Sequence, residues 1–541
     1  MKDLVLRCAL QNAIQYNGRA TVNSVLGLVF ALDNSSDKKL IIEEVNKIVP
    51  EVNRMSNDEQ LKLLKRLGEI KKKKDVKKRI RLEKVKGKVV MRFAPNPNGA
   101  MSFGHSRVAL WNWFFVERYN GKFLLRMDDT DPRIKIPLKE AYSWFKEDLK
   151  WLGITPNKTI IQSKRLKIYY LYAEKLIQKG FAYVDTIPAE KMREMLQKQL
   201  ISDERNEQPD IVLKKWKKMF TSYKEGAAVL RIKTDIMHPN PAVRDWVAFR
   251  IIKRHKHPLT KGNVWPTLNF SSAIDDHDFC VTHILRGSDL EISDTRQKYI
   301  YEYFGWTYPN TMYNGKFLIS GVKSTSEINE LIKEGKITGW DDPRLGTLKA
   351  LRKRGFQAEA IVQFIKDQGI GKNDLNVNIS SLESYNKKFV DNKANRYFFI
   401  ENPHKVIISG NSLKETKVPL HPDDKKRGFR TFKVHNEFYI QDELKWNTVY
   451  RFMHLFNVKN NEIISTDPDP VLNAKAVHWL PVSNDLVNVE IVMPDNSIKK
   501  GLGESGLRKV KINQIVQFER FSYCCLNSKL KKKMVFYFTH K

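Results

Sequence analysis

The residues of this chain best suited to chemistry lie in one short loop, residues 95–105. Pro95, Pro97 and Gly99 forbid regular structure there, and Gly104-His105 stands where an apolar helical pattern begins. Free backbone N–H groups at the N-terminus of a helix form a natural seat for phosphate. A histidine at that place can donate a hydrogen bond to negative charge that develops during a reaction. The loop therefore predicts a site for a phosphorylated nucleotide.

The neighbouring segments predict the elements that position this loop. Residues 88–94 alternate apolar side chains, as a strand does, and the helical pattern from Gly104 ends at Asn120-Gly121, a helix stop signal. The apolar run 123–127 then indicates a second buried strand. Strand, helix and strand form a βαβ unit, and an open parallel sheet binds nucleotides at such a crossover. The loop contains neither a G-x-G-x-x-G fingerprint nor a P-loop.

Composition indicates a multidomain protein with a polyanionic partner. At 541 residues, three to five domains are expected, and 41% hydrophobic residues are enough for normal cores. Lys and Arg exceed Asp and Glu by 95 − 61 = 34, an excess typical of nucleic-acid binding, although lysine is spread along the whole chain. No signal peptide and no stretch of about 18 apolar residues is found, so we expect a cytoplasmic protein without a membrane segment. No C-x-x-C pair occurs among the four cysteines, which argues against a zinc knuckle or a disulfide framework, and the four are Cys8, Cys280, Cys524 and Cys525.

Changes of pattern along the chain divide it into five predicted segments. Residues 1–87 are helical, with a helix start at Ser56-Asn57-Asp58, and end in a basic run over 70–88 that is either a solvated linker or a phosphate contact. A nucleotide-binding half is expected over 88–195 and a polar insertion over 196–265. The sheet is expected to resume in 266–385, where helical patterns then dominate. Many short β-type segments in 386–541 predict one or two β-barrels.

Several motifs place the chain near a known family. Ser102-Phe103-Gly104-His105 resembles the His-Ile-Gly-His signature of class I aminoacyl-tRNA synthetases, and the flanks RFAPNPNG and LLRMDDTDPR resemble the glutamyl and glutaminyl branch. The chain is similar to the archaeal-type glutamyl-tRNA synthetases in four ordered blocks: ALQNAIQYNGRA (9–20) with EVNRMS (51–56); the stretch 90–131; VTHILRG (281–287) with YIYEYFGW (299–306) and GWDDPRLGTLKALRKRG (339–355); and NRYFFIENP (395–403).

The resemblance implies an α/β fold and an activity. It implies a class I Rossmann-like catalytic domain with an N-terminal helical domain, an acceptor-end-binding insertion, a helical stem-contact region and C-terminal β-barrels that bind the anticodon. The reaction would be that of an ATP-dependent glutamate–tRNA ligase, with ATP and Mg²⁺ and no dedicated metal ligands from the protein. We expect a monomer whose partners are glutamate and tRNA(Glu), and whether it also charges tRNA(Gln) stays open.

The resemblance also implies which residues act on ATP. His105, Ser102 and Lys323 are the catalytic candidates. Ser102 stands where the family has its first signature histidine and cannot carry positive charge, while Thr325 replaces the lysine of the second signature, which leaves Lys323 as the nearest cation. The candidates for ATP binding are Pro95, Asn96, Pro97, Asn98, Gly99, Ala100, Met101, Ser102, Phe103, Gly104 (for close approach of the adenine), His105, Lys323, Ser324, Thr325 and Ser326.

The amino-acid pocket is implied in the same way. Arginine suits a carboxylate because its guanidinium donates a fork of hydrogen bonds. Arg92 and Arg286 match the family's substrate arginines, Asp128 matches the acid that receives the α-ammonium group, and Ser272 is a nearby polar residue. Leu268 stands where the family commonly has a tyrosine. For Asp129 and Asp131 we expect capping of a helix that begins beside Pro132.

Base-specific contacts to tRNA are expected from the β-rich end, where splayed bases stack on aromatic or arginine side chains. The candidates are Arg427, Arg430, Phe432, Arg451 and Phe452. Two other functions stay open. A glutaminyl-tRNA synthetase is opposed by Arg286, since those enzymes lack arginine there, and an inactive tRNA-binding paralogue is favoured only by the departures at Ser102, Leu268 and Thr325.

Overall fold

The computed structural model divides into two compact units, Met1–Arg79 and Ile80–Lys541. It describes residues 2–16, 18–33, 37–68, 80–319 and 325–541. Among these residues no helix is long and apolar enough to cross a membrane.

The first unit is a bundle of four helices, α1 (Lys2–Gln15), α2 (Val22–Leu32), α3 (Lys38–Arg54) and α4 (Asn57–Leu67). Its core includes Val5, Leu10, Val45 and Val52. The predicted helix start is confirmed, because Ser56 caps α4 and exchanges hydrogen bonds with Glu59 in a capping box.

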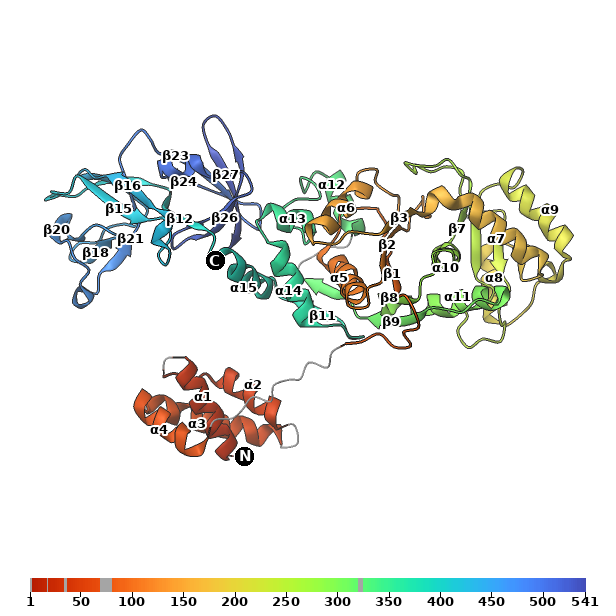
Figure 1. Ribbon diagram of the computed structural model, residues 1–541, viewed down its shortest axis with the longest axis horizontal. Helices are drawn as coiled ribbons and strands as arrows, with labels where there is room; N and C mark the ends of the chain where they lie inside the picture. The colour runs from red at the N-terminus through yellow and green to blue at the C-terminus, as the bar shows by residue number, and fades with distance from the viewer. Residues whose placement is uncertain (1, 17, 34–36, 69–79, 320–324) are drawn as a thin grey trace. The chain divides into compact units, whose positions relative to one another are not determined.

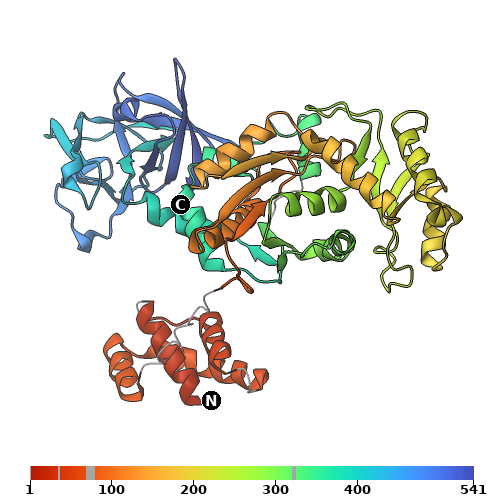
Figure 2. The same ribbon diagram turned by 45° about the vertical axis from the view of Figure 1, so that its right-hand side comes forward.

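The nucleotide-binding half is built on three parallel strands, β1 (Val90–Phe93), β2 (Lys122–Met127) and β3 (Lys158–Ile161). Helix α5 (Phe103–Arg118) joins β1 to β2, and α6 (Ala141–Trp151) lies between β2 and β3 (Figures 1 and 2). All of β1 and residues 123–127 of β2 are buried and mostly apolar, as in a sheet covered on both faces. The predicted βαβ unit is confirmed, with its loop at the first crossover.

The sheet resumes after a long insertion. Helix α10 (Leu268–Asp278) leads into β8 (His283–Gly287), and α11 (Glu291–Phe304) leads into β9 (Asn310–Asn314), which pairs with β8 in parallel. The Thr282 N–H donates to the Val90 carbonyl at 2.9 Å, so β8 lies beside β1. Segments almost 200 residues apart in the chain therefore lie side by side, with β8 and β9 in a two-stranded sheet of their own.

The insertion is a four-stranded antiparallel sheet, β4 (Ala182–Asp185), β5 (Val229–Ile232), β6 (Val247–Ile251) and β7 (Val264–Pro266). Helices α7 (Leu166–Gln178), α8 (Ala189–Gln197) and α9 (Pro209–Phe220) accompany it. The predicted boundary at residue 195 is too late, because β4 already pairs with β5. The reason is that an apolar strand such as β4 carries no mark of the sheet it will join.

The region after β9 is mostly helical. It contains β10 (Phe317–Ile319), α12 (Thr325–Lys333), α13 (Leu348–Lys353), α14 (Ala358–Gln368), β11 (Leu375–Val377) and α15 (Ile379–Val390). Strands β10 and β11 pair in parallel. Phe317, Leu348 and Phe364 belong to the same core as α5 and β1, so this region closes over the nucleotide-binding half.

The predicted β-rich end is confirmed. Its largest sheet has seven strands in the order β12-β25-β26-β27-β23-β24-β13. Smaller sheets have the strand orders β14-β17-β22, β15-β16 and β20-β19-β18-β21. The strands are β12 (Asn395–Tyr397), β13 (Phe399–Glu401), β14 (His404–Ile407), β15 (Glu415–Pro419), β16 (Phe429–Lys433), β17 (Glu437–Ile440), β18 (Val449–Phe452), β19 (Asn457–Lys459), β20 (Glu462–Ser465), β21 (Lys475–Val477), β22 (Trp479–Pro481), β23 (Val487–Val492), β24 (Ile498–Gly503), β25 (Ile515–Phe518), β26 (Ser522–Lys529) and β27 (Met534–His540).

Candidate active site

The loop between β1 and α5 is held by the segment that follows β2. The Pro95 carbonyl accepts the Asp128 N–H at 2.8 Å, and the Asn96 side-chain amide donates to the Asp128 carbonyl at 2.8 Å. The Pro97 carbonyl accepts the Leu138 N–H at 2.8 Å. The loop backbone is thus fixed by other strands and loops, as a nucleotide site requires.

Ser102 and His105 cap α5 together. The Ser102 hydroxyl accepts the His105 N–H at 3.2 Å, and the Ser102 N–H donates to Nδ1 of His105 at 3.3 Å. Burial and the nearby charge of Lys135 lower the pKa of His105 to about 4. At neutral pH the ring is uncharged, and because Nδ1 accepts, the proton sits on Nε2. His105 is therefore a neutral donor, and Ser102 has a capping role.

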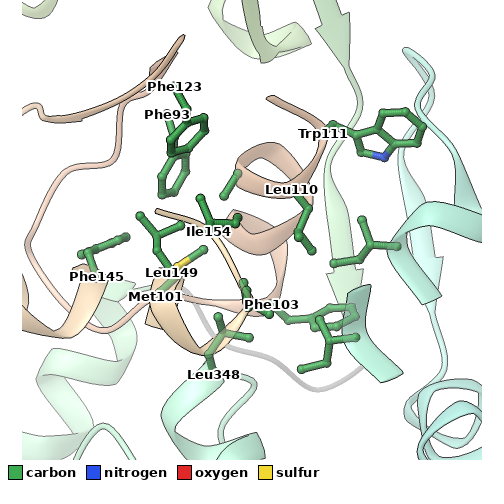
Figure 3. Close-up of a cluster of buried hydrophobic side chains, with 14 of the residues drawn as sticks. Phe93, Met101, Phe103, Leu110, Trp111, Phe123, Phe145, Leu149, Ile154 and Leu348 are labelled. Atoms are coloured by element: carbon green, nitrogen blue, oxygen red, sulfur yellow. The ribbon is translucent and has the colours of Figure 1, made fainter. Parts of the chain in front are cut away.

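Residues 339–355 form backbone hydrogen bonds with the signature loop. The Phe103 N–H donates to the Gly346 carbonyl at 2.9 Å, and the Leu348 N–H donates to the Met101 carbonyl at 2.8 Å. Leu348 lies beside Met101 and Phe103 in the buried cluster of Figure 3. The GWDDPRL block thus acts in this structure as the support of the signature loop.

The two glycines of the loop are required by packing within the protein. A Cβ at Gly99 would lie 2.3 Å from Cη2 of Trp340 and 2.7 Å from Cγ2 of Thr325. A Cβ at Gly104 would lie 3.0 Å from the Phe317 carbonyl oxygen. Close approach of adenine to Gly104 stays a prediction, while the structure supplies a second reason for glycine there.

A buried network of charges lies between β1, β2 and α10. Arg92 Nε and Arg126 Nη1 both contact Oδ1 of Asp276, at 3.1 and 2.6 Å. Arg126 also pairs with Asp128 at 2.6 Å and donates to the Ser272 hydroxyl at 3.0 Å. Three of the four predicted substrate residues (Arg92, Asp128 and Ser272) therefore meet around one arginine.

Arg286, the fourth, lies at the edge of this network on β8. It pairs with Asp294 at 2.6 Å and donates to Oε1 of Gln297 at 3.2 Å. Its Nε is buried and has no hydrogen-bond partner among the residues that the structure describes. A guanidinium with an unused donor suits an additional carboxylate.

Arg126 and Asp276 were not singled out from the sequence. Arg126 and Asp128 are two residues apart at the end of a strand, so their side chains leave on the same face. Asp275 and Asp276 stand in a helix whose residues 269–276 are all buried. Two adjacent acids directly after Ala273 and Ile274 were the available signal, because buried charges need partners.

The network shifts the pKa values of its acids in opposite directions. Burial would raise the pKa of Asp276, but the charges of Arg92, Arg126 and Arg286 outweigh it and lower that pKa. For Asp128, burial dominates over Arg126 and raises the pKa to about 6. Asp276 is thus a permanent counter-charge, whereas Asp128 titrates close to neutral pH.

The neighbouring acids differ from the prediction. Asp131 does accept the N–H groups of Arg133 and Ile134, but residues 132–135 are bends and the next helix, α6, begins at Ala141. Asp129 caps no adjacent helix. It accepts from the Ser163 N–H at 2.7 Å and from Tyr142 at 2.6 Å, so it ties together distant segments. The predicted helix after Pro132 is wrong, because Pro137 would fall in its interior, where proline is not tolerated.

The second signature lies only partly within the described residues. Lys323 and Ser324 fall outside them. Thr325 and Ser326 begin α12, and Asn329 of that helix donates to the Asn98 carbonyl at 3.2 Å. The start of α12 therefore rests on the first signature loop.

Comparison with known proteins now decides the family. The model for the catalytic domain of class I tRNA synthetases (E and Q) matches residues 88–392, and two models for their anticodon-binding domain match 394–477 and 441–527. Glutamate–tRNA ligases of Pyrococcus furiosus and Methanocaldococcus jannaschii are each 42% identical to this chain and are aligned over 100% of both chains. The chain belongs to the class I tRNA synthetases for glutamate and glutamine. A crystal structure of a glutamate tRNA ligase from Elizabethkingia meningosepticum is similar with a TM-score of 0.42 at 20% identity, over 57% of this chain and 70% of that one.

In this synthetase the anticodon-binding region buries three of the predicted tRNA contacts. Phe432 and Phe452 lie in the core of the β-rich end, 7% and 0% exposed. Arg430 is 7% exposed and pairs with Glu504 at 2.8 Å and Glu519 at 2.5 Å. Side chains held in this way offer no free face to a base, so the structure lends these three no support.

Two predicted contacts remain partly accessible. Arg427 pairs with Asp424 at 3.1 Å, and Arg451 donates to the Thr466 carbonyl at 2.7 Å. Both are half-buried. Their role in tRNA binding stays a prediction.

A polar cleft of about 180 Å³ opens between β12, β25 and the turn after β18. Its lining residues are Arg396, Pro419, Pro422, His454, Gln517, Glu519 and Arg520. Two arginines and an amide in a space of this size suit the edge and phosphate of one unstacked base. The sequence pointed here only through the block that contains Arg396.

The part of the chain that the structure describes has no group of three His, Cys, Asp or Glu residues placed to hold a metal ion. Magnesium in nucleotide enzymes is commonly held through the substrate phosphates and water. We therefore assign no residue to Mg²⁺.

Proposed function

We propose that this chain joins glutamate to tRNA in two steps. In the first, an oxygen of the glutamate α-carboxylate attacks the α-phosphorus of ATP, and pyrophosphate leaves. In the second, a ribose hydroxyl of the terminal tRNA adenosine attacks the glutamyl carbonyl, and AMP leaves. The full-length similarity to curated glutamate–tRNA ligases and the buried arginine network beneath the signature loop support this function.

The arginine network carries the choice of amino acid. Arg92, Arg126 and Arg286 each have a buried carboxylate partner in this network, which is Asp276, Asp128 and Asp294 respectively. The buried Nε of Arg286 has no hydrogen-bond partner among the described residues and gives the side-chain carboxylate of glutamate an unused donor. A guanidinium binds a charged carboxylate more strongly than a neutral amide oxygen, so this donor favours glutamate over glutamine.

The signature loop carries the ATP chemistry. The N-terminus of α5 offers a partial positive charge, and His105 adds an Nε2–H donor that needs no protonation. The ATP-binding role of residues 95–105 and the clamp role of Lys323 stay part of this proposal. Mg²⁺ would enter with the ATP phosphates.

The tRNA contacts follow from charge and shape. A net charge of +34 favours a polyanion, and the cleft lined by Arg396, Gln517 and Arg520 suits an unstacked base. A monomeric state, a cytoplasmic location and charging of tRNA(Gln) beside tRNA(Glu) remain predictions.

The decisive experiment is aminoacylation of total archaeal tRNA with labelled glutamate or glutamine in separate reactions. We expect charging with glutamate alone, and sequencing of the charged tRNAs then identifies tRNA(Glu) alone or tRNA(Glu) together with tRNA(Gln). Charging with glutamine would overturn the argument from the arginine network. Tight tRNA binding without any charging would favour the inactive paralogue.

The raised pKa of Asp128 predicts a pH dependence of glutamate binding. With a pKa of about 6, Asp128 is ionised at pH 7.5 and can hold the α-ammonium group, but it becomes neutral as the pH falls below 6. We expect the KM for glutamate to rise below pH 6 and Asp128→Asn to raise it about 10- to 100-fold at pH 7.5, the value of a charged hydrogen bond. Aminoacylation rates at saturating ATP and tRNA measure both effects.

The matched control is Asp131→Asn, three residues along the same loop and outside the network. It should keep the wild-type KM and pH profile. An Asp128→Asn enzyme that still shows the wild-type pH dependence would exclude Asp128 as the titrating group.

A further inference from the structure

Trp446 is the most exposed aromatic side chain among the large apolar residues that the structure leaves in solvent. It is 76% exposed, against 59% for Tyr16 and 51% for Phe429. It stands in the turn between β17 and β18, in the β-rich end. A tryptophan side chain left in water forgoes about 2–3 kcal/mol of stabilisation that burial would provide, so the stability of the fold does not explain its exposure.

The turn that presents Trp446 is held in one conformation. The Tyr450 hydroxyl accepts the Lys445 N–H at 2.9 Å and donates to the Glu443 carbonyl at 3.2 Å, both on the N-terminal side of the tryptophan. Oδ1 of Asn460 accepts the Asn447 N–H at 2.6 Å. The Trp446 side chain therefore projects from a backbone that hydrogen bonds hold in place, which lowers the entropy cost of binding.

A second loop, between β19 and β20, contacts this turn through Asn460 and contains residues with a left-handed backbone conformation. Asn460 and Asn461 have φ of 51° and 65°, and Asn447 of the first loop has φ of 58°. Asparagine tolerates this backbone region better than most residues. The side chains of Asn460 and Asn461 line one hollow together with Trp446.

The surroundings of the ring identify the chemistry of its ligand. A hollow of about 70 Å³ beside Trp446 is lined by Leu444, Lys445, Tyr450, Val458, Asn460 and Asn461. Two amides and a lysine border an open aromatic face, and no carboxylate lines the hollow. An aromatic face takes the plane of a base, amides take its polar edge, and a lysine takes the phosphate.

We propose that Trp446 is a stacking platform for an unpaired nucleobase of the bound tRNA. The inference rests on the proposed function, because it assumes that RNA reaches the β-rich end. It adds a second base site, since none of its lining residues belongs to the cleft of Arg396 and Gln517. A protein partner fits less well, because the rim is polar and the chain carries a charge of +34.

The test compares Trp446→Ala, Trp446→Phe and the wild type in aminoacylation of a tRNA(Glu) transcript. Loss of one stacked base by alanine substitution is worth about 1–3 kcal/mol, so we expect the KM for tRNA to rise about 5- to 150-fold. The kcat should stay unchanged, and Trp446→Phe should keep most of the affinity. Val471→Ala, at a residue 89% exposed in the same region, is the matched control.

A second arm separates stacking from a loss of structure. Transcripts with single abasic sites in the anticodon loop are bound to the wild type and to Trp446→Ala. Filter binding gives the Kd of each transcript for each protein. At the base that stacks, the effect of Trp446→Ala should vanish. An unchanged KM and Kd in Trp446→Ala, or an equal penalty with a minihelix that lacks the anticodon arm, would overturn the proposal. A wild type that binds the transcript but charges nothing would refute the proposed function, while the Kd values would still decide the role of Trp446.

Discussion

Replacing His105 with alanine is expected to lower kcat for glutamate charging by about 10²- to 10³-fold, with little change in the KM for glutamate. This is the usual effect of losing one donor that meets charge only in the transition state. The His105 ring is a neutral donor through Nε2, because Nδ1 already accepts the Ser102 N–H. Single-turnover charging, started by adding ATP to enzyme preloaded with glutamate and tRNA, measures a rate that includes this step.

The lowered pKa of His105 sets the pH range of this effect. With a folded pKa of about 4, below its usual 6.5, the ring stays neutral from pH 8 down to about pH 5. The folded state therefore resists protonation, and the stability that His105 contributes is present above pH 6.5 and is lost as the pH falls through 6.5 toward 4. The wild-type kcat should show no ionisation of His105 between pH 5 and 8. A protonation step there that disappears in His105→Ala would contradict this assignment.

Ser102→Ala is the matched control, because it removes the cap and leaves the histidine. Loss of an N-cap costs about 0.5–2 kcal/mol of stability. If Ser102 only caps α5, its kcat stays close to wild type while the thermal midpoint falls. A kcat lowered about 100-fold at an unchanged midpoint would restore the catalytic role expected from the signature position.

Replacing Asp276 with asparagine is expected to cost about 3–5 kcal/mol of unfolding free energy and to abolish glutamate binding at millimolar concentration. The physical reason is that Arg92 and Arg126 share this one buried carboxylate, at 3.1 and 2.6 Å. Without it two guanidinium groups face each other away from water, and an uncompensated buried charge is strongly destabilising. Urea unfolding followed by fluorescence, and charging at saturating ATP and tRNA, measure the two effects.

The control for this substitution is Asp278→Asn on the same helix. Asp278 pairs with Arg165 at 2.5 Å but has a more accessible side chain, 21% exposed, and partly exposed pairs are worth about 0.2–1 kcal/mol. Because the pKa of Asp276 is lowered, its stabilising effect is present above the pKa of an unfolded aspartate and is lost as the pH falls below it. A loss of stability in Asp276→Asn no larger than that in Asp278→Asn would show that the two arginines find other partners.

The local elements of the catalytic half could be read from the sequence. Pro95, Pro97 and Gly99 predict the loop, and the apolar alternation before it predicts β1. Asn120-Gly121 predicts the end of α5. These signals are local, since strand period, helix stops and proline geometry act over a few residues. The same holds for the short strands of the β-rich end.

The boundaries and the burial of single side chains could not be read in this way. The pattern of residues 182–185 does not show that β4 pairs with β5 of the insertion, and Phe432 and Phe452, two candidates for base contacts, lie in the core. An alternating strand tells that one face is buried but not which partner covers it. Only the assembled sheets decide that.

By itself, the sequence determined the family, the signature loop and three residues that meet at one site, Arg92, Asp128 and Ser272. The tertiary structure alone decided what holds them. It brought Arg126 and Asp276, 150 residues apart, to 2.6 Å and placed Ser102 at the cap of α5. The reason is that motifs record short-range chemistry, whereas counter-charges and packing partners are supplied by strands and helices that meet only when the chain folds.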